Sequence, residues 1–281
     1  MSHPLVQAAF RVSLVLAAVG LGGAVLAAGA GVVLLAVLPS AASSAEAKVC
    51  GKDDVVPAGG ADYLAENDIW GADTHQCIVV GDRSLTVDVA EHDKPPDGDP
   101  AAYPALFKGC HWGKCSADSG LPVQVSRMPD VLSDWASRQA ESGTYNAAYV
   151  VWFNTSPATT GAPDGAELII WLRSHGGIRP GGERIAGGVP LAGATWNIWF
   201  QPAGGHNRIV YERIGDVTSV RNLDIRAFTD DAVGRGWIRP EWYLIGVEAG
   251  FNLWSGGAGN AVDRFAVTVG RTPRLPPAGT P

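Results

Sequence analysis

The heptapeptide Ala166–Leu172 alternates apolar side chains with a mixed set, and this period of two is typical of a β-strand. Its uniformly apolar face belongs in a core and consists of Leu168, Ile170 and Leu172. A longer stretch, Tyr145–Asn154, alternates in the same way. Its two faces are so rich in β-branched and aromatic residues that a central strand is predicted. The chain must therefore bury extended segments against a second layer.

The rest of the sequence fits an all-β fold. The 36 Gly and 19 Pro provide many turns, and 46% hydrophobic residues can form a large core. We expect a curved two-sheet β-jelly-roll sandwich over residues 48–270, with one helix at 219–234. Residues 176–193 should be loops around one short strand. The clearest predicted strands are 76–80, 84–89, 145–154, 166–172, 195–201, 208–214, 242–254 and 261–269.

Both ends of the chain differ from this domain. Residues 12–38 carry no charge and are followed by Pro39 and a run of small residues. We interpret residues 1–47 as an export segment, either a signal peptide cleaved near Ala45–Ala47 or a retained membrane anchor. Residues 271–281 contain four Pro and are predicted to be a disordered tail. The domain should therefore be extracellular or in the cell envelope.

The four cysteines fit an oxidising location, because all of them follow the export segment. They allow three disulfide pairings. The sequence-local pairing would join Cys50 to Cys77 and Cys110 to Cys115. His111 lies between the last two, but this spacing is not a usual zinc motif.

The second face of the 166–172 strand carries the chemistry. Glu167 lies four residues before Trp171, an even spacing, so a carboxylate and an indole share one face. A carboxylate beside an indole suits a carbohydrate site, where the aromatic ring stacks on a sugar and the carboxylate acts at the anomeric carbon. An exposed Glu on an edge strand is the simpler alternative. A retaining glycosidase needs a second carboxyl group, and the strand 242–254 is its natural source.

Several short segments resemble glycoside hydrolase family 12, in that family's order. They are Asn67–Gly71, Tyr103-Pro104, Gly109–Cys115, Tyr145–Tyr149, Glu167–Trp171 and Glu248–Gly259. The resemblance spans about Val49 to Val269. It implies a curved jelly-roll and a retaining endo-β-1,4-glucanase or xyloglucanase that needs no cofactor and no metal.

The resemblance also implies roles for individual residues. Glu167 would be the nucleophile, with Ile169 where Met is usual, and Trp70 and Trp171 would stack on sugars. The sequence-local disulfide pairing is the one found in the family. We add Asp68, Trp112 and Trp254 as candidate substrate-binding residues, with packing as the alternative for the two indoles.

Three positions depart from the family pattern. Asn252 occupies the position of the acid/base Glu, and Leu253 follows it in place of Pro. An amide has no proton to donate in the relevant pH range. Val150 replaces an Asp that supports the nucleophile, and Asp68 replaces an Asn. We hypothesise that Glu167, with an apolar neighbour at Val150, has a raised pKa and is a poor nucleophile.

Two other carboxylates could replace the missing acid. Glu248 shares the face of Asn252 but lies four residues away, roughly 13 Å along a strand, which is too far for the retaining geometry. Asp68 is predicted to lie near the groove.

Two functions stay open from the sequence. The first is an exported hydrolase of β-1,4-glucan polysaccharide that is weak because position 252 is Asn. The second is a non-hydrolytic β-glucan-binding pseudoenzyme on the same scaffold. The net charge of −7 and the scattered Lys and Arg argue against a nucleic-acid partner. We expect a monomer, with membrane contact only through a retained N-terminal segment.

Overall fold

The computed structural model describes residues 46–203 and 205–270. Among these residues, no helix combines the length and the apolar character needed to cross a membrane. The predicted tail, and the predicted export segment apart from its last two residues, lie outside the described residues.

The described chain forms two β-sheets and one α-helix. The smaller sheet has six strands, in the order β1 (Ala47–Val49), β4 (Gln76–Val80), β5 (Leu85–Ala90), β17 (Ala261–Val269), β9 (Val131–Arg138) and β15 (Ser219–Asp224). The larger sheet has eleven. Its main path is β12 (Glu183–Leu191), β13 (Ala194–Ala203), β14 (His206–Arg213), β11 (Ala166–His175), β10 (Thr144–Asn154), β16 (Tyr243–Ser255), β6 (Ala105–His111), β3 (Tyr63–Glu66) and β2 (Val55–Ala58). Two short strands complete it, β7 (Lys114–Cys115) beside β6 and β8 (Val123–Gln124) beside β16. The predicted two-sheet jelly-roll is confirmed.

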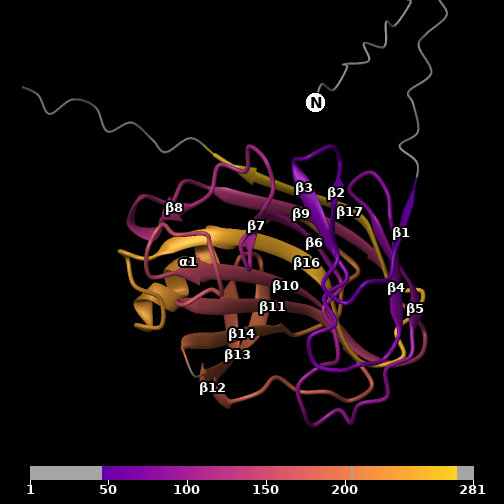
Figure 1. Cartoon of the computed structure of the whole chain (residues 1–281). Coiled ribbons are helices and arrows are strands. Elements are labelled where there is room, and N and C mark those ends of the chain that lie inside the picture. The colour runs from indigo at the N-terminus through magenta and orange to yellow at the C-terminus, as the bar shows by residue number, and fades with distance from the viewer. Residues whose placement is uncertain (1–45, 204, 271–281) are drawn as a thin grey trace, which may run out of the picture. The chain divides into compact units, whose positions relative to one another are not determined.

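The two sheets pack through aromatic side chains. Figure 1 shows β16, β10, β11, β14 and β13 side by side in one layer, with β9 and β17 in the other. Trp135 on β9 contacts Tyr149 on β10 edge-on, with ring centroids 5.1 Å apart, and Phe251 on β16 at 6.0 Å. All three side chains are fully or almost fully buried. Burial of such rings contributes about 2–3 kcal/mol each.

The alternation read from the sequence determines which residues face this core. On β11, Leu168, Ile170 and Leu172 lie in the core between the sheets, as predicted. The opposite faces of β10 and β11 form a second apolar cluster that includes Ala148, Val150, Trp152, Ile169 and Trp171. Because this second face is turned away from the main core, β10 and β11 can present side chains to a groove.

Two predicted elements differ from the structure. The helix is α1 (Ile225–Gly234), six residues shorter than expected, because 219–224 form β15 and pair with β9. Asp224 caps the helix by accepting a hydrogen bond from the Ala227 backbone N–H. In the glycine-rich region, β12 is nine residues long and not short. Its register with β13 shifts twice, which hides the alternation that sequence reading needs. A single 3₁₀ turn, Val125–Arg127, follows β8.

The disulfides follow the sequence-local pairing. Cys50 is bonded to Cys77, and Cys110 is bonded to Cys115. The first bond attaches the chain after β1 to β4, and the second closes the β6–β7 turn. Among the described residues no cysteine is free.

Candidate active site

Two adjoining hollows lie on the second face of the larger sheet. They have volumes of about 540 and 560 Å³ and share four lining residues: Trp70, Glu167, Arg208 and Asn252. We call the two hollows together the groove. The first also contains Trp171 and Trp254, and the second contains Asp68 and Trp112. The structure thus brings together all seven side chains that the sequence singled out as catalytic or substrate-binding.

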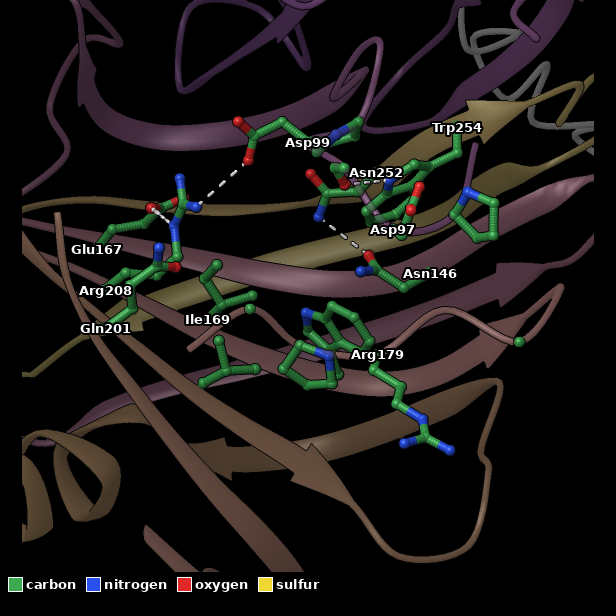
Figure 2. A pocket seen from close by; sticks show the side chains of 18 of the residues that line it. Asp97, Asp99, Asn146, Glu167, Ile169, Arg179, Gln201, Arg208, Asn252 and Trp254 are labelled. Carbon is green, nitrogen blue, oxygen red and sulfur yellow. Dashed lines mark hydrogen bonds and ion pairs between the residues drawn. The ribbon is translucent and has the colours of Figure 1, made fainter. Parts of the chain in front are cut away.

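Glu167 is held by a cationic side chain that the sequence analysis missed. β11 and β14 pair in parallel with Glu167 opposite Arg208. Arg208 Nε donates to Glu167 Oε2 at 2.7 Å, and its Nη1 lies 3.6 Å from Asp99 Oδ1 (Figure 2). His206 Nε2 lies 3.5 Å from the same Glu167 oxygen. Glu167 itself is only 9% exposed.

These contacts overturn the hypothesis of a raised pKa at Glu167. Burial does raise the pKa of this carboxyl, but the contact with His206 and the charge and hydrogen bond of Arg208 outweigh it. The net pKa lies below its ordinary value, so Glu167 is ionised at neutral pH. The hypothesis considered Val150 on β10 but not β14, which approaches from the other side.

Asn252 lies on β16 directly opposite Asn146 on β10. Its Nδ2 donates to Asn146 Oδ1 at 3.0 Å, as Figure 2 shows. Both amides reach the first hollow. This pair can donate hydrogen bonds to sugar hydroxyls, but it has no acidic proton to give to a leaving group.

The four groove indoles that the sequence singled out differ in what they can offer a ligand. Trp70 and Trp112 are 46% and 52% exposed, so each presents a ring to solvent. Trp171 and Trp254 are 5% and 4% exposed and form part of the groove wall. The Trp254 indole N–H donates to the Gly98 carbonyl at 2.6 Å, which ties the wall to the 92–100 loop. Stacking on a flat apolar sugar face is therefore available mainly at Trp70 and Trp112.

A buried polar network positions Trp70. Gln76 Nε2 donates to the backbone carbonyl of Asn67 at 2.6 Å, and His92 Nε2 lies 2.6 Å from Gln76 Oε1. The same segment carries Asp68, whose φ of 37° is in the left-handed region that non-glycine residues seldom adopt. Hydrogen bonds around Asn67 thus hold the backbone that carries Asp68 and Trp70. Strained backbone held in this way is common at functional sites.

Asp68 has an unusual environment for a carboxylate. Burial raises its pKa to about 8, and the nearby charges of Glu66 and Asp53 add to this, while His111 opposes it. Glu248, the other carboxylate considered as a replacement acid, is fully buried on β16, so a sugar in the groove cannot contact it.

Glu66 and Glu248 share a buried space with His111. His111 Nδ1 lies 2.7 Å from Glu66 Oε2 and 3.8 Å from Glu248 Oε1. Burial raises the pKa of both carboxyls well above the ordinary value. Trp152 stacks on the His111 ring at 5.6 Å and Trp112 meets it edge-on at 4.4 Å. Glu66 and Trp152 were also missed, since each looks like an ordinary strand residue in the sequence.

Comparison with known proteins gives one consistent result. A family model described as Glycosyl hydrolase family 12 matches residues 61–270. A curated relative, endoglucanase S of Pectobacterium parmentieri, is 30% identical over 218 residues, which cover 74% of this chain and 81% of that protein.

Solved structures agree. Endoglucanase cel12A from Rhodothermus marinus is 46% identical with a TM-score of 0.75, over 80% of this chain and 99% of that one. A metagenome-derived glycoside hydrolase family 12 endoglucanase is 44% identical with a TM-score of 0.77, over 80% and 98%. A family 12 xyloglucanase from Bacillus licheniformis, solved with a ligand, is 26% identical with a TM-score of 0.73, over 80% and 100%.

Proposed function

Because the chain belongs to glycosyl hydrolase family 12, we propose that it hydrolyses β-1,4-glucan polysaccharide by the retaining scheme, with Glu167 as the nucleophile. The observation that carries this proposal is the state of Glu167. It lies in a groove, and its pKa is lowered, so it is an anion that can attack an anomeric carbon.

The proposed reaction is slow because position 252 lacks an acid. In the retaining scheme a carboxylic acid protonates the leaving oxygen as the nucleophile attacks, and general acid–base help of this kind is worth about 10²–10⁴-fold in rate. Asn252 cannot supply the proton. A glucosyl hydroxyl is a poor leaving group, so the lack of an acid should slow hydrolysis of the natural polymer most.

The ion pair with Arg208 also affects the attack. The guanidinium favours the charged form of Glu167 but occupies Oε2, which leaves Oε1 for bond formation. Asp99 competes for the same guanidinium from the other side. We infer that a sugar in the groove is attacked by the oxygen that Arg208 does not hold.

The substrate follows from the groove and the relatives. Trp70 and Trp112 offer exposed rings, and the similar proteins are named as endoglucanases or as a xyloglucanase. Both kinds of polymer have a β-1,4-glucan backbone. Export is part of the proposal, because the two disulfides suit an oxidising compartment.

A second function is favoured by a specific observation, the amide pair Asn146–Asn252 where an acid is needed. On this view the protein binds β-glucan without cutting it. The aromatic groove would supply affinity. The Glu167–Arg208 pair would hydrogen-bond to hydroxyl groups of the sugar and would not take part in a reaction.

One experiment separates the two functions. Reducing-sugar release from β-glucan is measured for the protein and for Glu167→Ala, with Glu183→Ala on exposed β12 as the matched control. A hydrolase loses its release in Glu167→Ala and keeps it in Glu183→Ala. If neither the parent nor the control releases sugar, while all three bind β-glucan in affinity electrophoresis, the binding function is correct.

A further inference from the structure

The cluster of Glu66, His111 and Glu248 plays no part in the proposed hydrolysis. Its members come from three adjacent strands of the larger sheet, β3, β6 and β16. All three residues are buried, and Glu248 has no exposed surface at all. Glu66 and His111 also reach the second hollow of the groove, so the cluster is close to solvent on one side.

The ligand atoms have the spacing of a metal site. One nitrogen of His111 and one oxygen from each carboxylate all lie within 4.8 Å of one another. Two ligands about 2.1 Å from a zinc ion lie about 3.4 Å apart at the tetrahedral angle. The distances from His111 Nδ1 to the two carboxylates, 2.7 and 3.8 Å, bracket that separation. Small side-chain movements would therefore complete the coordination.

Of the four carboxylate oxygens in this cluster, only Glu66 Oε2, which contacts His111, has a hydrogen-bond partner among the described residues. Both oxygens of Glu248 and Oε1 of Glu66 are buried and lack a hydrogen-bond partner among the described residues. The indole N–H of Trp152 faces Glu248 and favours its charged form, but it makes no hydrogen bond of normal geometry. Buried polar atoms are nearly always paired, so three unpaired carboxylate oxygens beside an imidazole indicate a missing partner.

The charge balance points to a dication. Two ionised carboxylates buried together are costly unless a positive charge compensates them. No Lys or Arg forms an ion pair with Glu66 or Glu248 among the described residues; His111 alone does. A divalent ion would neutralise both carboxylates and satisfy their free oxygens. Protonation of the carboxyls is the competing arrangement.

We propose that Glu66, His111 and Glu248 bind one divalent transition-metal ion, and that Zn²⁺ fits this ligand set best. Three protein ligands of the imidazole and carboxylate type are usual for zinc sites that keep a fourth position for water. Glu66 and His111 line the second hollow together with Asp68, so water can reach the ligand set from that side. The cysteine spacing around His111 could not indicate this site, because its carboxylate ligands lie far away in the sequence.

The test is Zn²⁺ binding by the full chain, purified without a polyhistidine tag and stripped with chelator. Isothermal titration with Zn²⁺ alone should give one equivalent per chain, and Zn²⁺ should raise Tm. Glu248→Gln keeps the size of the side chain but removes a ligand charge, so it should bind Zn²⁺ at least tenfold more weakly. The matched control is Glu241→Gln, which removes an exposed carboxylate in the turn just before the same strand and should bind as the parent does.

Folding of the variant must be checked independently. Without metal, Glu248→Gln should be at least as stable as the parent, because it no longer buries a carboxyl group. The proposal is overturned if the parent takes up no stoichiometric Zn²⁺, which would mean that the carboxyls are simply protonated. It is also overturned if folded Glu248→Gln binds Zn²⁺ as tightly as the parent, which would mean adventitious binding by other side chains.

Discussion

At the scale of single residues, the environment of Glu167 determines what the groove can do. Two opposing effects act on its carboxyl. Burial raises its pKa, the contacts with His206 and Arg208 of β14 lower it, and these contacts outweigh burial. A carboxylate that is buried but ionised suits the nucleophile role that we propose for Glu167. The same contacts make Arg208 and His206 the residues on which the charge of Glu167 depends.

Arg208→Met should raise the pKa of Glu167, because only the contact with His206 then opposes the effect of burial. The acidic limb of the pH–rate profile should move to higher pH, and carbon NMR of the Glu167 carboxyl should titrate at higher pH. Arg179→Met removes another groove guanidinium, one that is exposed and has no ion pair with Glu167, and should leave both measurements unchanged. An unchanged titration in Arg208→Met would contradict this account.

The sign of the accompanying stability change follows from linkage. The pKa of Glu167 is lower in the folded protein than in the unfolded chain, so its ionisation stabilises the fold above the unfolded value of about 4.3. This contribution is lost as pH falls through the folded pKa. In Arg208→Met this contribution should be smaller, because one of the two groups that lower the pKa of Glu167 is gone.

Residue-level prediction from the sequence succeeded where one strand alone determines the outcome. The alternation of β11 placed Glu167 and Trp171 on the groove face, and the motif order identified Trp70 and Asn252 as groove residues. Arg208 was missed although its strand was expected. β11 and β14 pair in parallel although β12 and β13 lie between them in the sequence. No local sequence pattern encodes this pairing.

At the scale of elements, the boundary between β15 and α1 shows how tertiary pairing limits a helical pattern. Apolar spacing suggested a helix from residue 219, but β15 pairs with β9, and the helix begins only after Asp224. The side chain of Asp224 satisfies a backbone N–H at the start of the helix, which would otherwise lack a partner.

Asp224→Ala should therefore destabilise the protein by about 1 kcal/mol, measured by chemical denaturation. Asp230→Ala is the matched control on the same helix. Asp230 is exposed, and among the described residues its one ion pair is with Arg226 in the preceding turn, so its loss should cost about 0.3–0.5 kcal/mol. An equal loss of unfolding free energy in the two variants would show that the capping hydrogen bond contributes no more than an exposed ion pair.

At the scale of the whole molecule, the two disulfides close loops of very different length. Cys50 and Cys77 are 27 residues apart, whereas Cys110 and Cys115 are separated by five. In the chain-entropy model, replacing the first pair by Ala should cost about 3.5 kcal/mol and replacing the second about 2 kcal/mol. Denaturation of the two double variants measures the difference, and a larger loss for the short loop would contradict this explanation.

The overall architecture was predictable because composition and alternation agree across many segments. The turn-forming residues, the clean strands and the ordered motifs all indicated one two-sheet fold. Long β12 was underestimated, since register shifts and glycines break its period of two. The buried cluster of Glu66, His111 and Glu248 was also hidden, because it exists only when three strands are laid side by side.

The central claim is that the groove is a family 12 active site whose acid is missing at position 252. The most direct measurement is hydrolysis of β-glucan by Asn252→Glu, with Asn252→Gln as the control that adds the same length without an acid. We predict a gain of about 10²–10⁴-fold for Asn252→Glu and none for Asn252→Gln. On aryl glycosides with good leaving groups the gain should be far smaller. A folded Asn252→Glu that hydrolyses β-glucan no faster than the parent would contradict the account.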